Sequence, residues 1–145
     1  MKTKEETIAA LIKRYQMQQH PEGGWYAETY RHSKAYDFPG FEGSRNISTS
    51  ILFLLPEGQK SALHRIKSDE IWYYHAGGTL HIITLDENGM EQRHPLGSNI
   101  EKGDNFQYTV KAGTWFGAEP TEGSGYCLVG CSVSPGFDFR DFELM

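Results

Sequence analysis

The chain has 145 residues, of which 38% are hydrophobic, 23% charged and 13% aromatic. The high aromatic content argues against intrinsic disorder and indicates a folded protein with its own core. The net charge is -5, and no basic run is present, so nucleic acid is disfavoured as a partner. No apolar stretch reaches the roughly 20 residues of a membrane span, and no signal-peptide pattern opens the chain. We therefore expect a cytoplasmic protein with no membrane partner.

The predicted elements begin with one helix. Thr3 and Glu6 have the spacing of a capping box, and an apolar stripe follows at Ile8, Leu11, Ile12 and Tyr15. After Gly24 the pattern changes to short runs of β-forming residues separated by turn residues. A loop is expected over residues 32–44. We predict strands at about 25–31, 45–55, 61–66, 69–75, 79–85, 90–96, 105–110, 114–119 and 126–133. Cys127 and Cys131 share the last strand, too far apart for a disulfide, so both are expected to be free.

One helix followed by many short strands predicts a mainly all-β fold, an antiparallel sandwich or barrel such as a jelly roll. We expect a single domain, with a helix at about 3–17 and a β-barrel at about 24–134. The aromatic tail at 135–145 either closes over this barrel or packs on a partner. Function should then lie with the polar and aromatic side chains of the inner face.

The densest group of chemically competent residues lies between 58 and 77. His64 and Glu70 lie on consecutive predicted strands, and pairing of these strands would let both side chains face one interior. Alternation along a strand places Glu70, Trp72 and Tyr74 on one face. His64 and Glu70 could form a base with its orienting carboxylate, or simply satisfy each other in a polar pocket.

Further candidates for the pocket wall have less specific signals. Arg45 would recognise an anion if it pointed inward, and would otherwise form a structural ion pair. Trp72, Trp115 and Phe116 could form aromatic walls or belong to the plain core. Ser50 and Ser132 could present hydroxyl groups to the interior or lie on the outer face.

Several segments together resemble one known family. Gly58, His64, Glu70 and Gly77 have the spacing of the first motif of the cupin superfamily, whose members have RmlC-like folds. The segments 20–26, 61–65, 68–72, 112–118, 129–131 and 134–139 are similar, in order, to the DUF985 (Cupin_5) family. The resemblance implies a double-stranded β-helix, the cupin jelly roll, and a homodimer. It also implies a small-molecule-binding role whose biochemistry is not established.

The chain departs from the pattern of metal-binding cupins, which supply three histidines and one glutamate. Ile66 and Phe116 stand at two of the histidine positions, so only His64 and Glu70 remain. Catalytic metal sites normally keep three protein ligands. We therefore expect no cofactor. A divalent metal would need His64, Glu70 and a substitute ligand such as Gln107 or His75.

The resulting hypothesis is a small-molecule ligand held inside the barrel without a metal. Its lining is expected from His64, Glu70, Trp72, Gln107, Trp115, Phe116, Arg45, Ser50 and Ser132. The first alternative is a metal-independent isomerase or epimerase that uses His64 as base, Glu70 as its partner and Tyr74 or Tyr26 as acid. The second alternative is a degenerate metal-dependent cupin enzyme.

Overall fold

The helix α1 (Lys4–Tyr15) opens the computed structural model, which describes residues 2–145. It begins at Thr3, whose Oγ1 accepts a hydrogen bond from the Glu6 backbone N–H at 3.1 Å. The Glu6 carboxylate accepts one in return from Thr3 N at 3.4 Å. This reciprocal pair confirms the predicted capping box.

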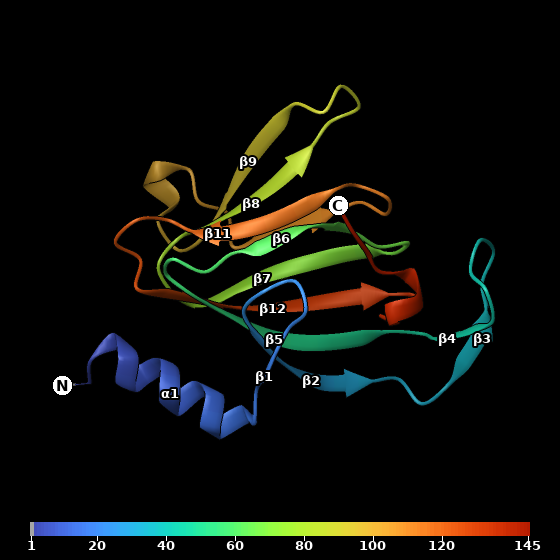
Figure 1. Ribbon diagram of the computed structural model, residues 1–145, viewed down its shortest axis with the longest axis horizontal. Coiled ribbons are helices and arrows are strands. Elements are labelled where there is room, and N and C mark those ends of the chain that lie inside the picture. Colours follow the sequence, from blue (N-terminus) through green and yellow to red (C-terminus); the bar gives the residue numbers. More distant parts are fainter. Residues whose placement is uncertain (1) are drawn as a thin grey trace.

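Two antiparallel sheets follow, facing each other (Figure 1). The six-stranded sheet has the order β1 (Gln18–Gln19), β2 (Trp25–Arg31), β5 (Thr49–Pro56), β12 (Tyr126–Ser134), β7 (Asp69–Gly77) and β10 (Gln107–Val110). The five-stranded sheet has the order β13 (Glu143–Leu144), β6 (Ser61–Arg65), β11 (Phe116–Pro120), β8 (Leu80–Leu85) and β9 (Glu91–Leu96). The strands β3 (Ala35–Asp37) and β4 (Ser44–Asn46) pair as a separate hairpin. Two short 3₁₀ helices, η1 (Ile100–Lys102) and η2 (Phe139–Asp141), are the remaining elements. This architecture confirms the predicted double-stranded β-helix.

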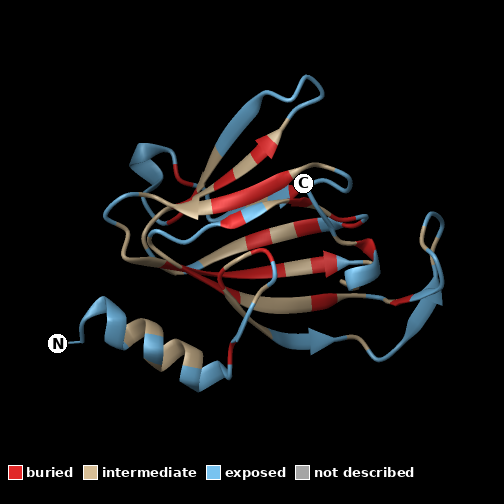
Figure 2. Ribbon diagram, viewed as in Figure 1, coloured by how far each residue is buried: buried red, intermediate tan, exposed pale blue. Residues whose placement is uncertain are grey.

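Alternation along β5 divides its side chains between two clusters. Phe53 and Leu55 point between the sheets and pack in the same core cluster as Trp72. Leu54 points outward and packs with Leu128 under the apolar stripe of α1. Figure 2 shows the buried residues gathered on the strands, whereas α1 has only half-buried and exposed residues. The helix therefore covers part of the outer face of the six-stranded sheet.

The segment from Ser44 to Pro56 differs from its prediction. The expected continuous strand at 45–55 is wrong, because the chain leaves the strand conformation at Ile47 and Ser48 and separates β4 from β5. The expected loop at 32–44 contains β3, which pairs with β4. Cys127 and Cys131 are both free and buried, as predicted.

The C-terminal tail closes over the protein's own barrel. Strand β13 pairs with β6, placing Leu144 opposite His64 in the register. The buried guanidinium of Arg45 holds both carboxylate oxygens of Asp141, at 2.9 and 2.8 Å. A buried, bidentate ion pair of this kind fixes the position of the tail.

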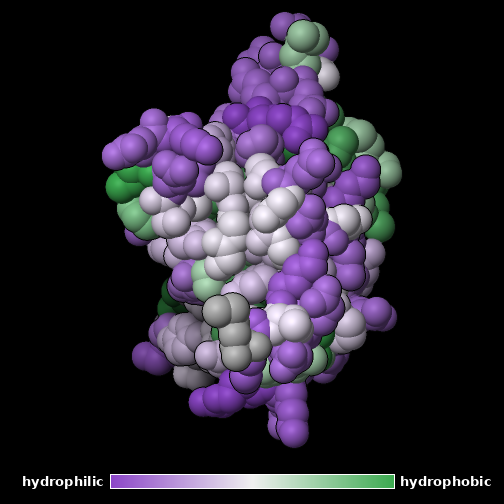
Figure 3. Space-filling model, turned by 90° about the vertical axis from the view of Figure 1, so that its left-hand side faces the viewer, coloured by the Kyte–Doolittle hydropathy of each residue, from purple (hydrophilic) through white to green (hydrophobic). Residues whose placement is uncertain are grey.

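At the end of the molecule that carries the N-terminus, hydrophilic residues surround a central strip of intermediate hydropathy (Figure 3). No helix in residues 2–145 has both the length and the apolar character needed to cross a membrane.

Candidate functional site

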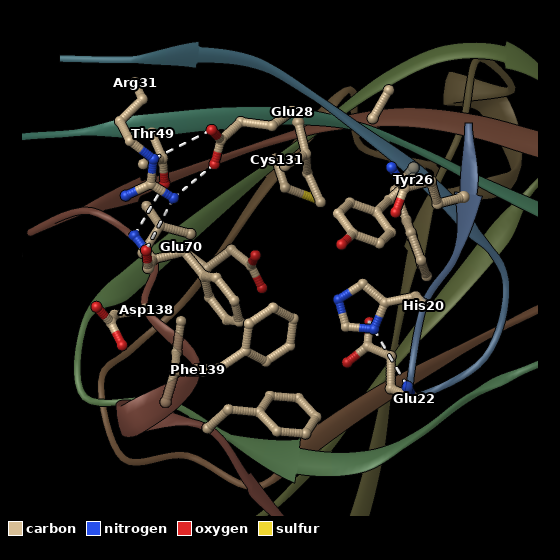
Figure 4. A pocket seen from close by; sticks show the side chains of 18 of the residues that line it. His20, Glu22, Tyr26, Glu28, Arg31, Thr49, Glu70, Cys131, Asp138 and Phe139 are labelled. Atoms are coloured by element: carbon tan, nitrogen blue, oxygen red, sulfur yellow. Dashed lines mark hydrogen bonds and ion pairs between the residues drawn. The ribbon is translucent and has the colours of Figure 1, made fainter. Parts of the chain in front are cut away.

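A cavity of about 640 Å³ opens into the barrel. Strands β2, β5, β6, β7 and β12 form its walls, together with the turn between β1 and β2 and the C-terminal tail (Figure 4). Its polar lining includes His20, Glu22, Glu28, Arg31, Thr49, His64, Glu70 and Asp138, and its aromatic lining includes Tyr26, Phe53, Trp72, Phe137, Phe139 and Phe142. A volume of this size fits the range of roughly 300–1,000 Å³ that is usual for small-molecule sites.

The His64 ring has a polar partner at each nitrogen and packs against two aromatic rings. Its Nε2 lies 2.7 Å from Glu22 Oε2, and its Nδ1 lies 2.7 Å from the carbonyl oxygen of Ala62. The ring of Phe116 packs against it with centroids 4.1 Å apart, and that of Phe142 at 5.3 Å. A carbonyl oxygen can only accept, so Nδ1 carries a proton. Both ring nitrogens are thus already engaged by the protein.

The turn between β1 and β2 brings Glu22 into the cavity. Its carbonyl accepts a hydrogen bond from Ala62 N of strand β6 at 2.8 Å, which ties the turn to the strand carrying His64. Gly23 follows with φ of +114°, and a Cβ atom there would lie 2.2 Å from the Lys60 carbonyl oxygen. Only glycine fits this close approach.

His20 lies on the same turn. The side chains of His20 and Glu22 are each only 7% exposed. Nδ1 of His20 accepts a hydrogen bond from Glu22 N at 3.2 Å, so the proton of a neutral ring lies on Nε2. That second nitrogen faces the cavity (Figure 4), and the ring packs edge-on against Tyr26 with centroids 4.8 Å apart.

Glu70 points into the same space from β7 (Figure 4). It is 8% exposed and forms no ion pair with any residue in the described range 2–145. The buried Nε1 of Trp72 has no hydrogen bond of ordinary geometry. Its N–H lies close to the Glu70 carboxyl and favours the ionised form, which lowers the pKa of Glu70 slightly. Glu70 and Trp72 thus bring spare hydrogen-bonding capacity to the cavity.

Burial and neighbouring charges separate the pKa values of these groups. Burial raises the pKa of Glu70 to about 8, although the positive charge of His64 opposes the rise. Burial alone would lower the pKa of His64, but the hydrogen bond and charge of Glu22 outweigh burial and raise it. Burial lowers the pKa of His20. At neutral pH the arrangement therefore favours a protonated His64, a protonated Glu70 and a neutral His20.

The far end of the cavity carries a second set of charges. The Arg31 guanidinium donates to both carboxylate oxygens of Glu28, at 2.6 and 3.1 Å, and to the Phe137 carbonyl oxygen at 3.2 Å. Asp138 is paired with Arg140 at 2.9 Å. These charges are already balanced by neighbouring side chains.

Of the predicted site residues, the structure brings His64, Glu70 and Trp72 together in the cavity. The predicted partnership of His64 with Glu70 is wrong, because Glu22 holds the histidine instead. Phe116 is buried beneath the His64 ring and does not line the cavity. Tyr74 does not line it either, and its hydroxyl donates to the carbonyl oxygen of Gly77.

The remaining predicted residues lie elsewhere. Arg45 takes the structural role by pairing with Asp141, and Trp115 lies outside the cavity under the guanidinium of Arg65 at 4.5 Å. Ser50 and Ser132 are opposite each other in the register of β5 and β12, on the outer face, where Ser132 Oγ lies 3.2 Å from the Tyr73 hydroxyl. Gln107 is exposed at the start of β10. None of these side chains is in the cavity lining.

His20 and Glu22 were not among the predicted site residues. A signal existed, since both lie in the segment 20–26 that carries the family resemblance, with two glycines that permit a tight turn. The aromatic residues Phe137, Phe139 and Phe142 were also assigned only to a tail, although they form one wall of the cavity.

The donor set does not fit a cupin-type metal. Ile66 lines the cavity and Phe116 is buried beside it, so two positions that would need histidine are hydrocarbon. Both nitrogens of His64 are engaged. In residues 2–145 no three His, Cys, Asp or Glu side chains are grouped so that they could hold a metal ion.

Solved structures of proteins from two organisms are similar to nearly the whole chain. A hypothetical protein from Leishmania major is 39% identical with a TM-score of 0.86, covering 94% of this chain and 86% of that one. A protein from Shewanella oneidensis is 41% identical with a TM-score of 0.84, covering 94% of this chain and 82% of that one. No curated protein matches the chain significantly.

More distant similarity concerns the fold alone. An oxalate decarboxylase from Lactobacillus farciminis is 19% identical with a TM-score of 0.62, and the match covers 89% of this chain and 33% of that one. An uncharacterised Klebsiella pneumoniae protein with a double-stranded β-helix domain is 16% identical with a TM-score of 0.60, covering 92% of both chains. The family model of Cupin_5, described as Cupin superfamily (DUF985), matches residues 9–145, and the chain therefore belongs to this family of cupins.

Proposed function

We propose that the protein binds a small organic molecule inside the barrel and holds it without a metal. The observation that carries the proposal is the cavity of about 640 Å³ with the buried, unpaired carboxyl of Glu70 at its polar end. A buried polar group without a partner is costly, and a native protein keeps one where a ligand can satisfy it. Aromatic side chains surround this end and offer faces for the apolar part of a ligand.

A thermal-shift screen against a metabolite library tests this function. A ligand at one hundred times its Kd adds about 2.7 kcal/mol of stability, or roughly 8 °C in Tm for a domain of this size. The affinity of each hit is then measured for two variants. Phe139→Ala removes a ring from the cavity wall, and Phe106→Ala removes a ring outside the cavity. The two phenylalanines are matched in exposure, at 51% and 50%.

The expected result is a hit whose affinity falls in Phe139→Ala and stays unchanged in Phe106→Ala. A screen without any hit, or hits that both variants bind equally, would count against a ligand in the barrel.

A second function, proton transfer at a carbon next to a carbonyl group, is favoured by the raised pKa of Glu70 and by the Nε2–H of His20, which faces the cavity. In this version the ionised Glu70 carboxylate is the base and the Nε2–H of His20 is the donor, because His64 has no free nitrogen. Deuterium uptake from D₂O into a bound hit would support catalysis if Glu70→Gln abolished it. A hit that binds tightly without any exchange would leave the protein a binder.

A further inference from the structure

The acidic and basic side chains that line the cavity have partners of opposite charge, with one exception. His64 pairs with Glu22 at 2.7 Å, and Arg31 pairs with Glu28 at 2.6 Å. Asp138 has its counter-ion in Arg140, just outside the lining. Glu70 has no ionic partner among the described residues. When Glu70 ionises, its negative charge therefore has no positive partner in the wall.

The environment of Glu70 defines what could supply that positive partner. Its carboxyl is 8% exposed and is directed into the cavity (Figure 4), so a ligand can reach it although bulk water is largely excluded. A carboxylate buried without a counter-ion is strongly disfavoured, and a bound cation removes this penalty. The carboxyl group can accept two hydrogen bonds side by side from an amidine, or one or two from an amine.

Aromatic rings surround the same space. Tyr26, Phe137, Phe139 and Phe142 line the cavity, and their π faces carry partial negative charge. Rings at such positions attract an organic cation and also pack against its apolar body.

An anionic ligand would find no free cationic donor in this wall. Arg31 is the one arginine in the lining, and its guanidinium is committed to Glu28, to Asn46 Oδ1 at 2.9 Å and to the Phe137 carbonyl oxygen. His64 is committed to Glu22 and Ala62. Binding an anion would require breaking one of these pairs.

We propose that the cavity selects a singly charged organic cation, an amine or amidine with an apolar body, whose charge pairs with Glu70. The inference rests on the proposed binding function and names the chemical class of its ligand. Selection by charge leads to an expected difference of at least about tenfold in affinity between a cation and a neutral molecule of the same shape.

Binding of a cation is coupled to a proton. The groups facing Glu70 are His64 from β6, His20 and Glu22 from the turn between β1 and β2, and Cys131 from β12. Since burial raises the pKa of Glu70 to about 8, a cation must displace its proton at neutral pH. The affinity should therefore rise as the pH increases toward 8 and level off above it.

The test uses three planar probes of nearly identical shape: benzamidine, benzamide and benzoate, which are cationic, neutral and anionic at these pH values. Affinities are measured by calorimetry on the full chain at pH values on both sides of 8, in two buffers that differ in ionisation enthalpy. The variant Glu70→Gln removes the charge and keeps the shape of the side chain. Glu87→Gln makes the same change at an exposed turn residue outside the cavity.

We expect benzamidine to bind at least about tenfold more tightly than benzamide or benzoate, with proton release below pH 8. Glu70→Gln should abolish both the preference and the proton release, while Glu87→Gln keeps both. Equal or better binding of benzamide or benzoate overturns the cationic class and leaves the proposed function standing. If none of the three binds at millimolar concentration, the cation site is overturned, and the metabolite screen alone decides the proposed function.

Discussion

His64 Nε2 lies 2.7 Å from Glu22 Oε2, so the histidine of the cupin motif is joined to a carboxylate from the turn between β1 and β2. This pairing changes the role of the histidine. In the isomerase hypothesis His64 was the base, yet here its second nitrogen is also held, by the Ala62 carbonyl oxygen. The groups that remain free to meet a ligand are the Glu70 carboxyl and Nε2 of His20.

The buried pair should be important for stability. Glu22→Gln leaves the protonated form of His64 without its counter-ion, and breaking a buried pair in this way costs about 3 kcal/mol of unfolding free energy. Urea denaturation measures the loss. The control Glu91→Gln breaks an exposed pair with Arg93 and should change stability by less than about 1 kcal/mol. Equal effects of the two substitutions would contradict the pairing.

Glu70 should make the protein less stable as the pH rises. An ordinary glutamate loses its proton near pH 4.5, whereas Glu70 holds its proton to about pH 8. Between these values the unfolded chain binds fewer protons than the folded protein, so the free energy of unfolding falls with rising pH. His64 acts in the same direction, since its contribution is full below 6.5 and is lost as pH rises through its raised pKa.

Glu70→Gln should remove most of this slope and make the protein more stable at pH 8, by on the order of 3 kcal/mol. Chemical denaturation across pH 5 to 9 provides the comparison, with Glu87→Gln as the matched surface change. Parallel profiles for wild type and Glu70→Gln would show that Glu70 does not hold a proton in the cavity.

The fold could be predicted because its signals are local. Capping at Thr3 and Glu6 involves neighbours in sequence, and a short run of β-branched and aromatic residues marks strands such as β7. The break at Ile47 and Ser48 could not be predicted, because both residues suit a continuous strand, and the interruption depends on the β3–β4 hairpin.

The site was predicted only in part because its geometry is non-local. His64, Glu70 and Trp72 were found from their spacing, whereas Glu22 reaches His64 through a turn whose closure depends on a contact with β6. Which side chains of β5 and β12 face the interior also depends on contacts between strands that are distant in sequence. A shift of one residue exchanges Thr49 in the cavity for Ser50 on the outer face.

Two apolar features that a partner chain could cover are covered within the chain itself. The apolar outer face of β5 is covered by α1, and the aromatic tail covers the protein's own cavity. The homodimer therefore stays a prediction from the family resemblance, and light scattering on the purified chain measures it.

The ion pair between Arg45 and Asp141 should hold the cavity wall formed by the tail. Arg45 is 2% exposed and Asp141 6%, so Asp141→Asn leaves a buried guanidinium without its charge partner, which costs about 3 to 5 kcal/mol. Hydrogen exchange should become faster over residues 136–144. Glu143→Gln, which breaks only the exposed contact with Arg65, should leave that exchange nearly unchanged. Similar exchange in both variants would contradict the anchoring role.

Gly23 should be essential for placing Glu22. Gly23→Ala introduces strain at φ +114° and a clash with the Lys60 carbonyl oxygen, whereas Gly89→Ala has φ +76° and open space around the added Cβ. The positive φ alone should lower the free energy of unfolding of each variant by about 1 kcal/mol. In Gly23→Ala the clash should lower it further and also weaken ligand binding. A Gly23→Ala variant as stable as Gly89→Ala would refute the close approach.

The protein should show no dependence on a divalent metal. Ile66 and Phe116 provide hydrocarbon where ligands would be needed, and a divalent ion would have to displace Glu22 from His64. Elemental mass spectrometry after separate incubation with zinc, manganese, iron and nickel should find far less than one metal per chain. A chelator should leave Tm and ligand affinity unchanged. A near-stoichiometric metal that is lost in both His64→Gln and Glu70→Gln would contradict the prediction of no metal. Such a result would mean that His64 binds the ion in place of Glu22.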